Sequence, residues 1–148
     1  MLHSEKTRIL LVNDDRCVSD VLGLILESRG YEVDVAHTGE EAIEKSRTNA
    51  YNLAVLDIDV PDTESKKLLG AMHEISPTMI RIIGTEIIRP KGALDAFNDY
   101  ADGYFVNPVE PSRLISLIEE KLEDQKDAKI TQTKKQRAHI GSETNKLL

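Results

Sequence analysis

The fold of this 148-residue chain is indicated by one stretch near its start, RILLVNDD (residues 8–15). Five residues form a nearly continuous apolar run, and three polar residues follow at once. A run of this kind is typical of a β-strand that is buried on both faces of a parallel sheet. The polar residues then stand at the carboxyl end of that strand, which is where open α/β sheets bind their ligands.

Alternating strand and helix patterns continue from this stretch to about residue 125. Further strands are predicted at residues 31–35, 53–56, 80–83 and 103–106. One helix is predicted to end before Gly30, and another to run to about residue 48 from a capping box of Thr38 and Glu41. Further helices are predicted over residues 64–75, 91–100 and the stretch with Pro111 in its first turn. Five strands that alternate with five helices predict an α/β fold with a single doubly wound, five-stranded parallel sheet. We therefore expect one domain over residues 7–125 and a basic tail or linker over residues 126–148.

Charge and composition limit the classes of function. The formal net charge is −7, with +4 in residues 126–148 and therefore −11 in residues 1–125. An acidic body does not attract nucleic acid, because phosphate binding needs clustered Lys and Arg. No apolar run approaches the ~18 residues of a membrane span, and no secretory segment is recognisable at the start, so a cytoplasmic protein is expected. The single cysteine, Cys17, excludes an internal disulfide.

Polar residues follow four of the predicted strands, at residues 13–15, 57–59, 85–86 and 107–108. A parallel α/β fold brings such loops together at one edge of the sheet. Carboxylates there suit Mg²⁺, which takes oxygen ligands, and a carboxylate beside that ion can attack a phosphoryl group. We interpret Asp15 as a helix cap, and Asp14 with Asp57 as the functional pair.

Five ordered blocks carry a resemblance to a known family: ILLVNDD (9–15), GYEV (30–33), AHTGEEA (36–42), LDIDVP (56–61) and ADGY (101–104). Residues 7–125 resemble a response-regulator receiver domain, the family of the bacterial chemotaxis regulators. Each block alone is weak, but their order and spacing together are specific. The resemblance implies a flavodoxin-like sheet in the order 2-1-3-4-5, with helices on both faces.

The resemblance also implies roles for individual residues. Asp57 falls on the phosphoacceptor and Asp14 on a metal-binding acid, and the backbone carbonyl of Asp59 falls on a further metal ligand. Thr85 falls on the switch hydroxyl that bonds a phosphoryl oxygen. Tyr104 falls on the switch aromatic, although it can equally be a strand aromatic that packs on a helix.

The chain departs from the family pattern at the reaction centre. Asn13 stands where the family usually has an acid, Asn107 where it has a lysine, and Glu86 where it has a small residue. Asn13 keeps an oxygen for a weak, water-mediated metal contact, but the lost charge is expected to weaken Mg²⁺ binding. Ser65 stands near the expected loop glycine, and the Asn107–Pro108 bond is expected to be cis, as in the family.

The resemblance favours a receiver module of a two-component phosphorelay, which accepts a phosphoryl group on Asp57 and switches a protein-interaction surface. Its expected partners are a histidine kinase or phosphotransfer protein and a downstream effector, and it can form a homodimer through the fourth helix, fifth strand and fifth helix. No contact with nucleic acid or membrane, and no enzymatic turnover, is expected. One alternative is a pseudo-receiver, which binds proteins with impaired phosphorylation or none. A remote alternative is a phosphatase similar to the haloacid dehalogenases, suggested by the spacing of Asp57 and Asp59.

Overall fold

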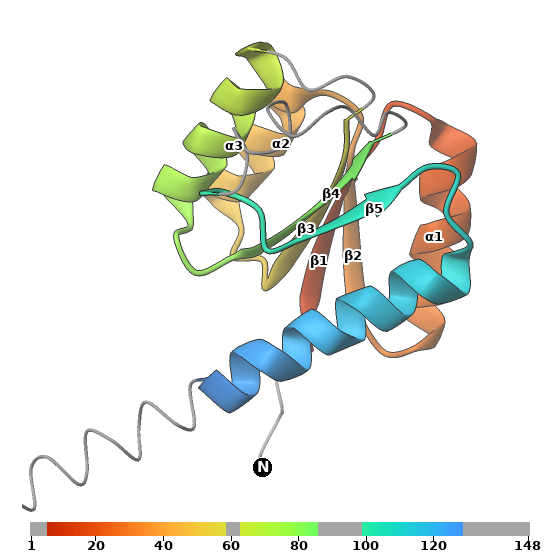
Figure 1. Cartoon of the computed structure of the whole chain (residues 1–148). Coiled ribbons are helices and arrows are strands. Elements are labelled where there is room, and N and C mark those ends of the chain that lie inside the picture. Colours follow the sequence, from red (N-terminus) through yellow and green to blue (C-terminus); the bar gives the residue numbers. More distant parts are fainter. Residues whose placement is uncertain (1–5, 59–62, 86–98, 129–148) are drawn as a thin grey trace, which may run out of the picture.

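The structure, a computed structural model, describes residues 6–58, 63–85 and 99–128 of the chain (Figure 1). Its strands and helices alternate along the chain. In order they are β1 (Arg8–Val12), α1 (Arg16–Ser28), β2 (Glu32–Ala36), α2 (Gly39–Thr48), β3 (Leu53–Asp57), α3 (Thr63–Ile75), β4 (Ile80–Thr85), β5 (Gly103–Val106) and a C-terminal helix over residues 111–128.

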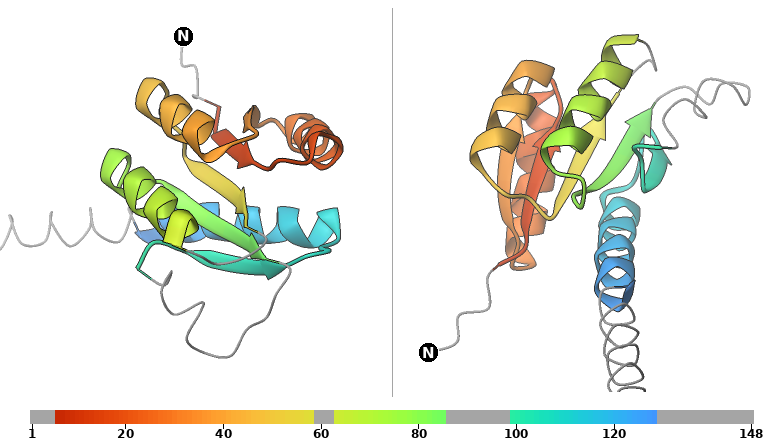
Figure 2. Two further views of the ribbon diagram at one scale, coloured as in Figure 1. Left: turned by 90° about the horizontal axis from the view of Figure 1, so that it is seen from above. Right: turned by 90° about the vertical axis from the view of Figure 1, so that its left-hand side faces the viewer.

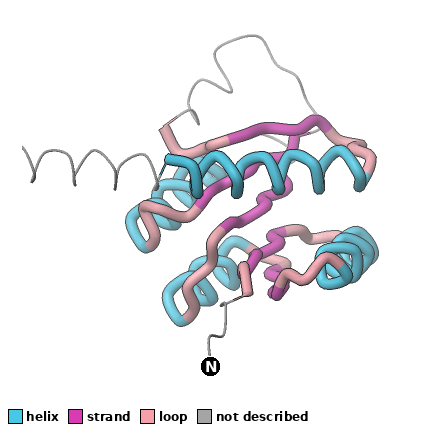
Figure 3. Tube along the Cα trace, turned by 90° about the horizontal axis from the view of Figure 1, so that it is seen from below, coloured by secondary structure: helices cyan, strands magenta, loops and turns pink. Residues whose placement is uncertain are grey.

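The five strands form one parallel sheet in the order β2-β1-β3-β4-β5. The predicted fold class and strand order are therefore confirmed. Helices α2 and α3 cover one face of the sheet, while α1 and the C-terminal helix lie on the other (Figure 2). Figure 3 shows the same layering from below, with the strands between the helices.

Side chains of the central strands alternate between two cores, because successive residues of a strand point to opposite faces. Leu10 and Leu56 pack on the side of α2 and α3, in a cluster with Leu69 and Met72. The residues between them in the strands pack on the other side; this second cluster includes Ile9, Leu11, Leu53, Val55, Leu26, Leu114 and Ile118. Apolar side chains thus cover both faces of β1 and β3, as the continuous apolar runs predicted.

The predicted helix ends are formed by the expected local contacts. Gly30 has φ 94° and donates its N–H to the carbonyl of Glu27 at 3.0 Å, which closes α1. Thr38 Oγ1 accepts from the backbone N–H of Glu41 at 3.1 Å. The Glu41 carboxylate in turn accepts from the backbone N–H of His37 at 3.1 Å, and this hydrogen bond lowers the pKa of Glu41. The sequence signals at both helix ends are therefore confirmed.

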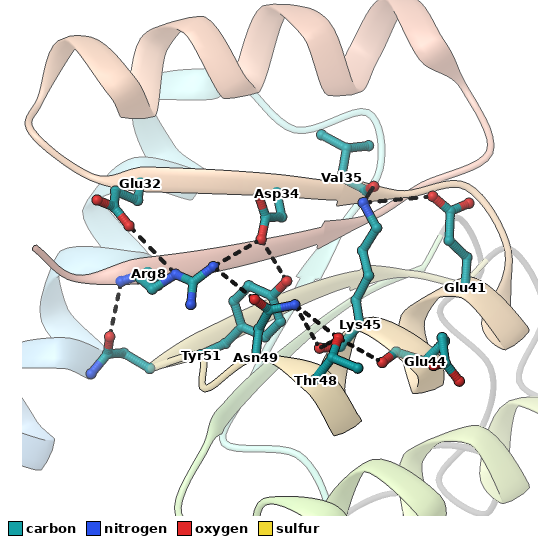
Figure 4. A network of polar contacts seen from close by, with 11 residues as sticks. Arg8, Glu32, Asp34, Val35, Glu41, Glu44, Lys45, Thr48, Asn49 and Tyr51 are labelled. Atoms are coloured by element: carbon teal, nitrogen blue, oxygen red, sulfur yellow. Dashed lines mark hydrogen bonds and ion pairs between the residues drawn. The ribbon is translucent and has the colours of Figure 1, made fainter.

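A polar network joins β1 to β2 and to the loop between α2 and β3 (Figure 4). Buried Tyr51 donates its hydroxyl hydrogen to Asp34 at 2.6 Å, and the Arg8 guanidinium reaches the same carboxylate at 3.2 Å. The guanidinium also lies over the Tyr51 ring, 5.2 Å from its centre, and donates to Asn49 at 3.3 Å. Burial raises the pKa of Tyr51, and the hydrogen bond to Asp34 adds to that effect. We call these four residues the Asp34 network.

Most of the helix predicted over residues 91–100 falls outside the described residues, and residues 99 and 100 form a turn. The C-terminal helix includes residues 126–128, at the start of the stretch predicted as a tail or linker. None of the helices in the described ranges has the length and apolar character that a membrane span requires.

Candidate functional site

The register of the sheet brings four loops to one edge. Asp57, the last residue of β3, pairs with Gly84 in β4, and the preceding Leu56 pairs with Val12 at the end of β1. Beyond the strands, the backbone N–H of Asn107 donates to the Thr85 carbonyl at 2.9 Å. The residues that follow β1, β3, β4 and β5 therefore meet at the carboxyl edge, as predicted for ligand sites of this architecture.

Asp57 lies half-buried at the centre of this edge and accepts two hydrogen bonds from side-chain amides. Asn13 Nδ2 donates to Asp57 Oδ2 at 2.9 Å. Asn107 Nδ2 donates to Asp57 Oδ1 at 2.6 Å. Asn13 and Asn107 thus both contact the central carboxylate, one at each oxygen. We call Asn13, Asp57 and Asn107 the amide clamp.

The orientation of Asn13 is fixed by its other contacts. Its side-chain oxygen accepts from the backbone N–H of Asp15 at 2.8 Å. Because a backbone N–H can only donate, the amide nitrogen of Asn13 must face Asp57. The backbone carbonyl of Asn13 lies 2.9 Å from His37 Nδ1. Because a carbonyl oxygen can only accept, His37 Nδ1 must carry the hydrogen. With 8% of its surface exposed, Asn13 is held from three sides.

Gly84, which pairs with Asp57 in the sheet, has no side chain, and the Phe105 ring occupies the space where one would lie. A Cβ atom on Gly84 would lie 2.1 Å from Phe105 Cζ, so position 84 has no space for any side chain while that ring is there. Gly84 stands between Asp57 and Phe105 in the sheet. The Asn107–Pro108 peptide bond follows β5 and is cis, as the resemblance implied.

Two cavities meet at Asp57, and both are also lined by Asn13 and Asp14. The larger, of about 820 Å³, extends along α1 to the C-terminal helix, and we call it the α1 cavity. The smaller, of about 350 Å³, lies toward His37 and Ser65. Asp14 and Asp57, predicted as a functional pair, therefore face common space. No lysine or arginine is found among the described residues that line either cavity.

The other residues singled out in the sequence lie at different places in the fold. Asp15 caps α1, since its carboxylate accepts from the backbone N–H groups of Cys17 and Val18 at 2.9 and 3.2 Å. Thr85 ends β4 with 2% of its surface exposed, and half-buried Tyr104 packs against the core on the side of α2 and α3. Asp59 and Glu86 lie outside the described residues.

The donor set is small for a metal ion. Within residues 6–58, 63–85 and 99–128 there is no group of three His, Cys, Asp or Glu side chains that could hold one. Asp14 and Asp57 line both cavities, while Asp15, which also lines the larger one, uses its carboxylate to cap α1. Mg²⁺ is commonly bound through one or two carboxylates and keeps several waters. The residues therefore fit Mg²⁺, with fewer charged ligands than a site of three acids would offer.

A five-stranded parallel sheet in this order, with carboxylates at its carboxyl edge, defines a flavodoxin-like domain of the receiver class. The family model that matches the chain, over residues 9–119, is described as the response regulator receiver domain. The chain therefore belongs to that family, the receiver domains of two-component response regulators. Receiver domains are signalling proteins and generally bind Mg²⁺ at the site of phosphorylation.

Relatives of the chain include bacterial regulatory proteins. Regulatory protein VanRB of Enterococcus faecalis is 32% identical over 112 residues, which cover 76% of this chain and 50% of VanRB. Transcriptional regulatory protein ResD of Bacillus subtilis is 30% identical over 118 residues, covering 78% of this chain and 48% of ResD. The chain thus spans about half the length of these relatives.

Solved receiver structures are similar over most of the chain. A CheY-like receiver domain protein from Methanospirillum hungatei JF-1 is 37% identical with a TM-score of 0.76, over 84% of this chain and 99% of that one. A two-component response regulator from Clostridium difficile is 28% identical with a TM-score of 0.71, over 80% of this chain and 97% of that one.

The sequence analysis does not predict the amide clamp. It predicts lost charges at Asn13 and Asn107, with an Asn13 oxygen for a weak, water-mediated metal contact, but not the hydrogen bonds that both amides donate to Asp57. The signal was available, because both residues follow strands that end at the same edge as Asp57. A pair of asparagines beside a carboxylate offers amide hydrogens as well as oxygens.

Proposed function

We propose that this chain is a receiver module of a two-component phosphorelay and that Asp57 is its phosphoacceptor. The observation that carries the proposal is the placement of Asp57: half-buried at the carboxyl edge, oriented through both oxygens and facing two cavities together with Asp14. Residues 7–125 form the receiver and residues 126–148 a basic tail or linker. The module acts in the cytoplasm as a signalling phosphoacceptor, with no catalytic turnover of its own.

In the chemical step, one Asp57 oxygen attacks the phosphorus of a phosphohistidine, the P–N bond breaks and the histidine leaves with the electron pair. Bound Mg²⁺ would supply charge for the phosphoryl oxygens, held by the carboxylates of Asp14 and Asp57 and the carbonyl of Asp59. The oxygen of Asn13 accepts from Asp15, and its second lone pair can accept from a metal-bound water. The hydroxyl of Thr85 and the ring of Tyr104 are the switch residues.

The amide clamp sets the reactivity of this site. Each Asp57 oxygen already accepts an amide hydrogen, and a hydrogen bond to a charged group is worth about 1.5–3 kcal/mol. An oxygen that becomes the bridging atom of an acyl phosphate is a poorer acceptor, so one of these bonds weakens in the product. Asn107 carries no charge to pair with the new phosphoryl oxygens. We therefore expect slow phosphorylation and weak Mg²⁺ binding, with Glu86 adding further repulsion.

The partners follow from this role. A histidine kinase or phosphotransfer protein would deliver the phosphoryl group, and a downstream effector would bind the switched surface. Self-association through the fourth helix, β5 and the C-terminal helix is a further expectation. Direct contact with nucleic acid or with a membrane forms no part of the proposal.

A second candidate function is a pseudo-receiver that binds its partners without phosphorylation. The amide clamp favours it, because both Asp57 oxygens are engaged while the charge that would stabilise the product is missing. The two candidates differ in one measurable property, the response of the full chain to a phosphoryl analogue.

Beryllofluoride with Mg²⁺ provides the test, read as amide shifts in ¹H–¹⁵N spectra of the full chain. The proposed function predicts saturable shifts at residues around Asp57, Thr85 and Tyr104 that require both Mg²⁺ and beryllofluoride. Acetyl phosphate should add one phosphoryl group to the intact mass, and Asp57→Asn should not gain it. Spectra unchanged by beryllofluoride, together with an unchanged mass, would establish the pseudo-receiver instead.

A further inference from the structure

We infer that His37 is a positioning residue of the phosphorylation site, and that it acts through the backbone carbonyl of Asn13. Its imidazole holds the loop between β1 and α1, residues 13–15, in the conformation that places Asn13 and Asp14 at the site. The inference rests on the proposed function, since it names a residue outside the reaction centre on which that site depends.

The end of β2 and the residue after it hold Asn13 by two backbone contacts. The Asn13 N–H donates to the carbonyl of Ala36 at 3.0 Å and so continues the pairing of β1 with β2 by one residue. The Asn13 carbonyl then accepts from His37 Nδ1 at 2.9 Å. A side chain thereby takes over from the strand backbone at the point where β2 ends. Both hydrogen-bonding groups of the Asn13 main chain are therefore held by two successive residues, Ala36 and His37.

The position of His37 is fixed in turn by contacts with α2. The His37 N–H donates to Glu41 Oε2 at 3.1 Å, and Glu41 Oε1 lies 3.7 Å from Lys45 Nζ (Figure 4). Lys45 also donates to the carbonyl of Val35 at 2.8 Å, which ties α2 back to β2. Nδ1 carries a hydrogen in the imidazolium ion as well as in the neutral tautomer that the contact with Asn13 selects. The hydrogen bond to Asn13 therefore does not depend on the charge of His37.

The contact with His37 affects two residues of the site. Asn13 donates its side-chain amide to Asp57 at 2.9 Å, and Asp14 lines both cavities together with Asp57. The Asn13 carbonyl and the Asp14 N–H belong to one planar peptide unit, so a rotation of that unit turns the start of Asp14 with it. Because Asn13 is buried, its carbonyl would turn toward water if it lost the hydrogen of His37. That rotation would displace the Asn13 amide and the Asp14 carboxylate together.

A matched pair of variants of the full chain tests the inference by Mg²⁺ titration. In His37→Asn the amide nitrogen stands the same number of bonds from the backbone as imidazole Nδ1, whereas His37→Leu has the same branching without a donor. His37→Leu should weaken Mg²⁺ affinity about two- to tenfold, the equivalent of one net hydrogen bond, and His37→Asn should restore it. If the unsubstituted chain binds Mg²⁺ and the two variants have equal affinities, the donor is irrelevant and the inference is wrong.

Thr38→Ala is the control for a general loss of stability. It removes the cap of α2 beside His37 and leaves the contact between His37 and Asn13 in place. Urea unfolding should show a less stable chain, whereas the Mg²⁺ affinity should equal that of the unsubstituted chain. If Thr38→Ala weakens Mg²⁺ binding as much as His37→Leu does, the effect reports stability rather than position, which would also overturn the inference.

Two measurements on the resting chain separate the inference from the proposed function. Without Mg²⁺ or beryllofluoride, the ¹H–¹⁵N signals of the Asn13 side-chain amide should move in His37→Leu and keep their positions in His37→Asn. In the unsubstituted chain at alkaline pH, imidazole ¹⁵N spectra should show neutral His37 as the Nδ1–H tautomer. A chain that binds neither Mg²⁺ nor beryllofluoride would refute the proposed function alone. An Nε2–H tautomer, or Asn13 signals that ignore His37→Leu, would refute the role of His37.

Discussion

Asp57 and Asp34 are both partly buried carboxylates, but the side chains seen to donate hydrogen bonds to them differ in charge. Asp34 meets the phenol of Tyr51 and the cationic guanidinium of Arg8. Asp57 meets two neutral amides and faces two cavities. A carboxylate neutralised within the fold contributes to stability. A carboxylate that neutral amides orient beside a cavity can bind a cation or attack a phosphoryl group.

The largest expected effect is the loss of the phosphoryl response in Asp57→Asn. An amide oxygen is a far poorer nucleophile than a carboxylate, so acetyl phosphate should leave the mass of this variant unchanged. Asp34→Asn makes the same chemical change in the Asp34 network and should keep the response of the unsubstituted chain. Intact-mass measurement compares all three. Phosphorylation of Asp57→Asn, or its loss in Asp34→Asn, would contradict the division of roles.

The second-largest expected effect is a gain in beryllofluoride affinity in the variant Asn107→Lys. A unit charge pair at 4 Å is worth about 4 kcal/mol at an effective dielectric of ~20 before desolvation is subtracted, so beryllofluoride affinity should rise at least about tenfold. Adding Asn13→Asp should strengthen Mg²⁺ binding, because it restores a third acid. Ser28→Lys adds the same charge at the exposed end of α1 and should change neither affinity. Equal gains in Ser28→Lys would show that net charge, rather than position, is responsible.

A smaller effect is expected on the free energy of unfolding, which should depend more on the Asp34 network than on the amide clamp. Tyr51→Phe removes the buried donor of Asp34 and should lower the free energy of unfolding by about 1–2 kcal/mol. Asn107→Ala removes a donor of Asp57, but water in the adjoining cavities can replace it, so the loss should stay below about 1 kcal/mol. Urea unfolding measures both. A larger loss in Asn107→Ala would make the amide clamp a stabilising element like the Asp34 network.

The smallest effect concerns alkaline pH. Folding raises the pKa of Tyr51, so the folded chain holds the phenol proton more tightly than the unfolded chain does. The stability from this group is full below the unfolded pKa of about 10 and is lost as the pH rises toward the folded value. The unfolding free energy should therefore fall above about pH 10, and less steeply in Tyr51→Phe. Parallel pH profiles for the two chains would exclude Tyr51 as the cause.

Sequence patterns were sufficient for the fold because its strands are buried on both faces. Apolar runs such as residues 8–12 bury all their side chains when both faces of the strand are covered, as in the interior of a parallel sheet. Each run was also followed by a helical pattern. Local signals also held, since Gly30 and Thr38 act within a few residues of themselves. The strand order came from the resemblance, because periodicity carries no information on which strands are neighbours.

Contacts between residues that are far apart in the sequence could not be predicted. The sequence placed Asn13, Asp57 and Asn107 at one edge, but which amide atom faces the carboxylate depends on the third partner, the backbone N–H of Asp15. Arg81 is a second example: a charged residue in a predicted buried strand, it donates to the Tyr100 carbonyl at 2.6 Å and to His73 at 2.8 Å. Burial lowers the pKa of Arg81. No local sequence pattern predicts which residues contact its guanidinium.

The contact between Gly84 and Phe105 has a consequence for how sequences of this kind can diverge. Any side chain at position 84 requires the ring at position 105 to move or shrink, and β4 and β5 carry the two positions side by side. The pair should therefore covary: lineages that acquire alanine or a larger residue at 84 should show a smaller residue at 105. Position 84 also pairs with Asp57 in β3, so substitutions at this pair are expected to shift the Asp57 carboxylate as well.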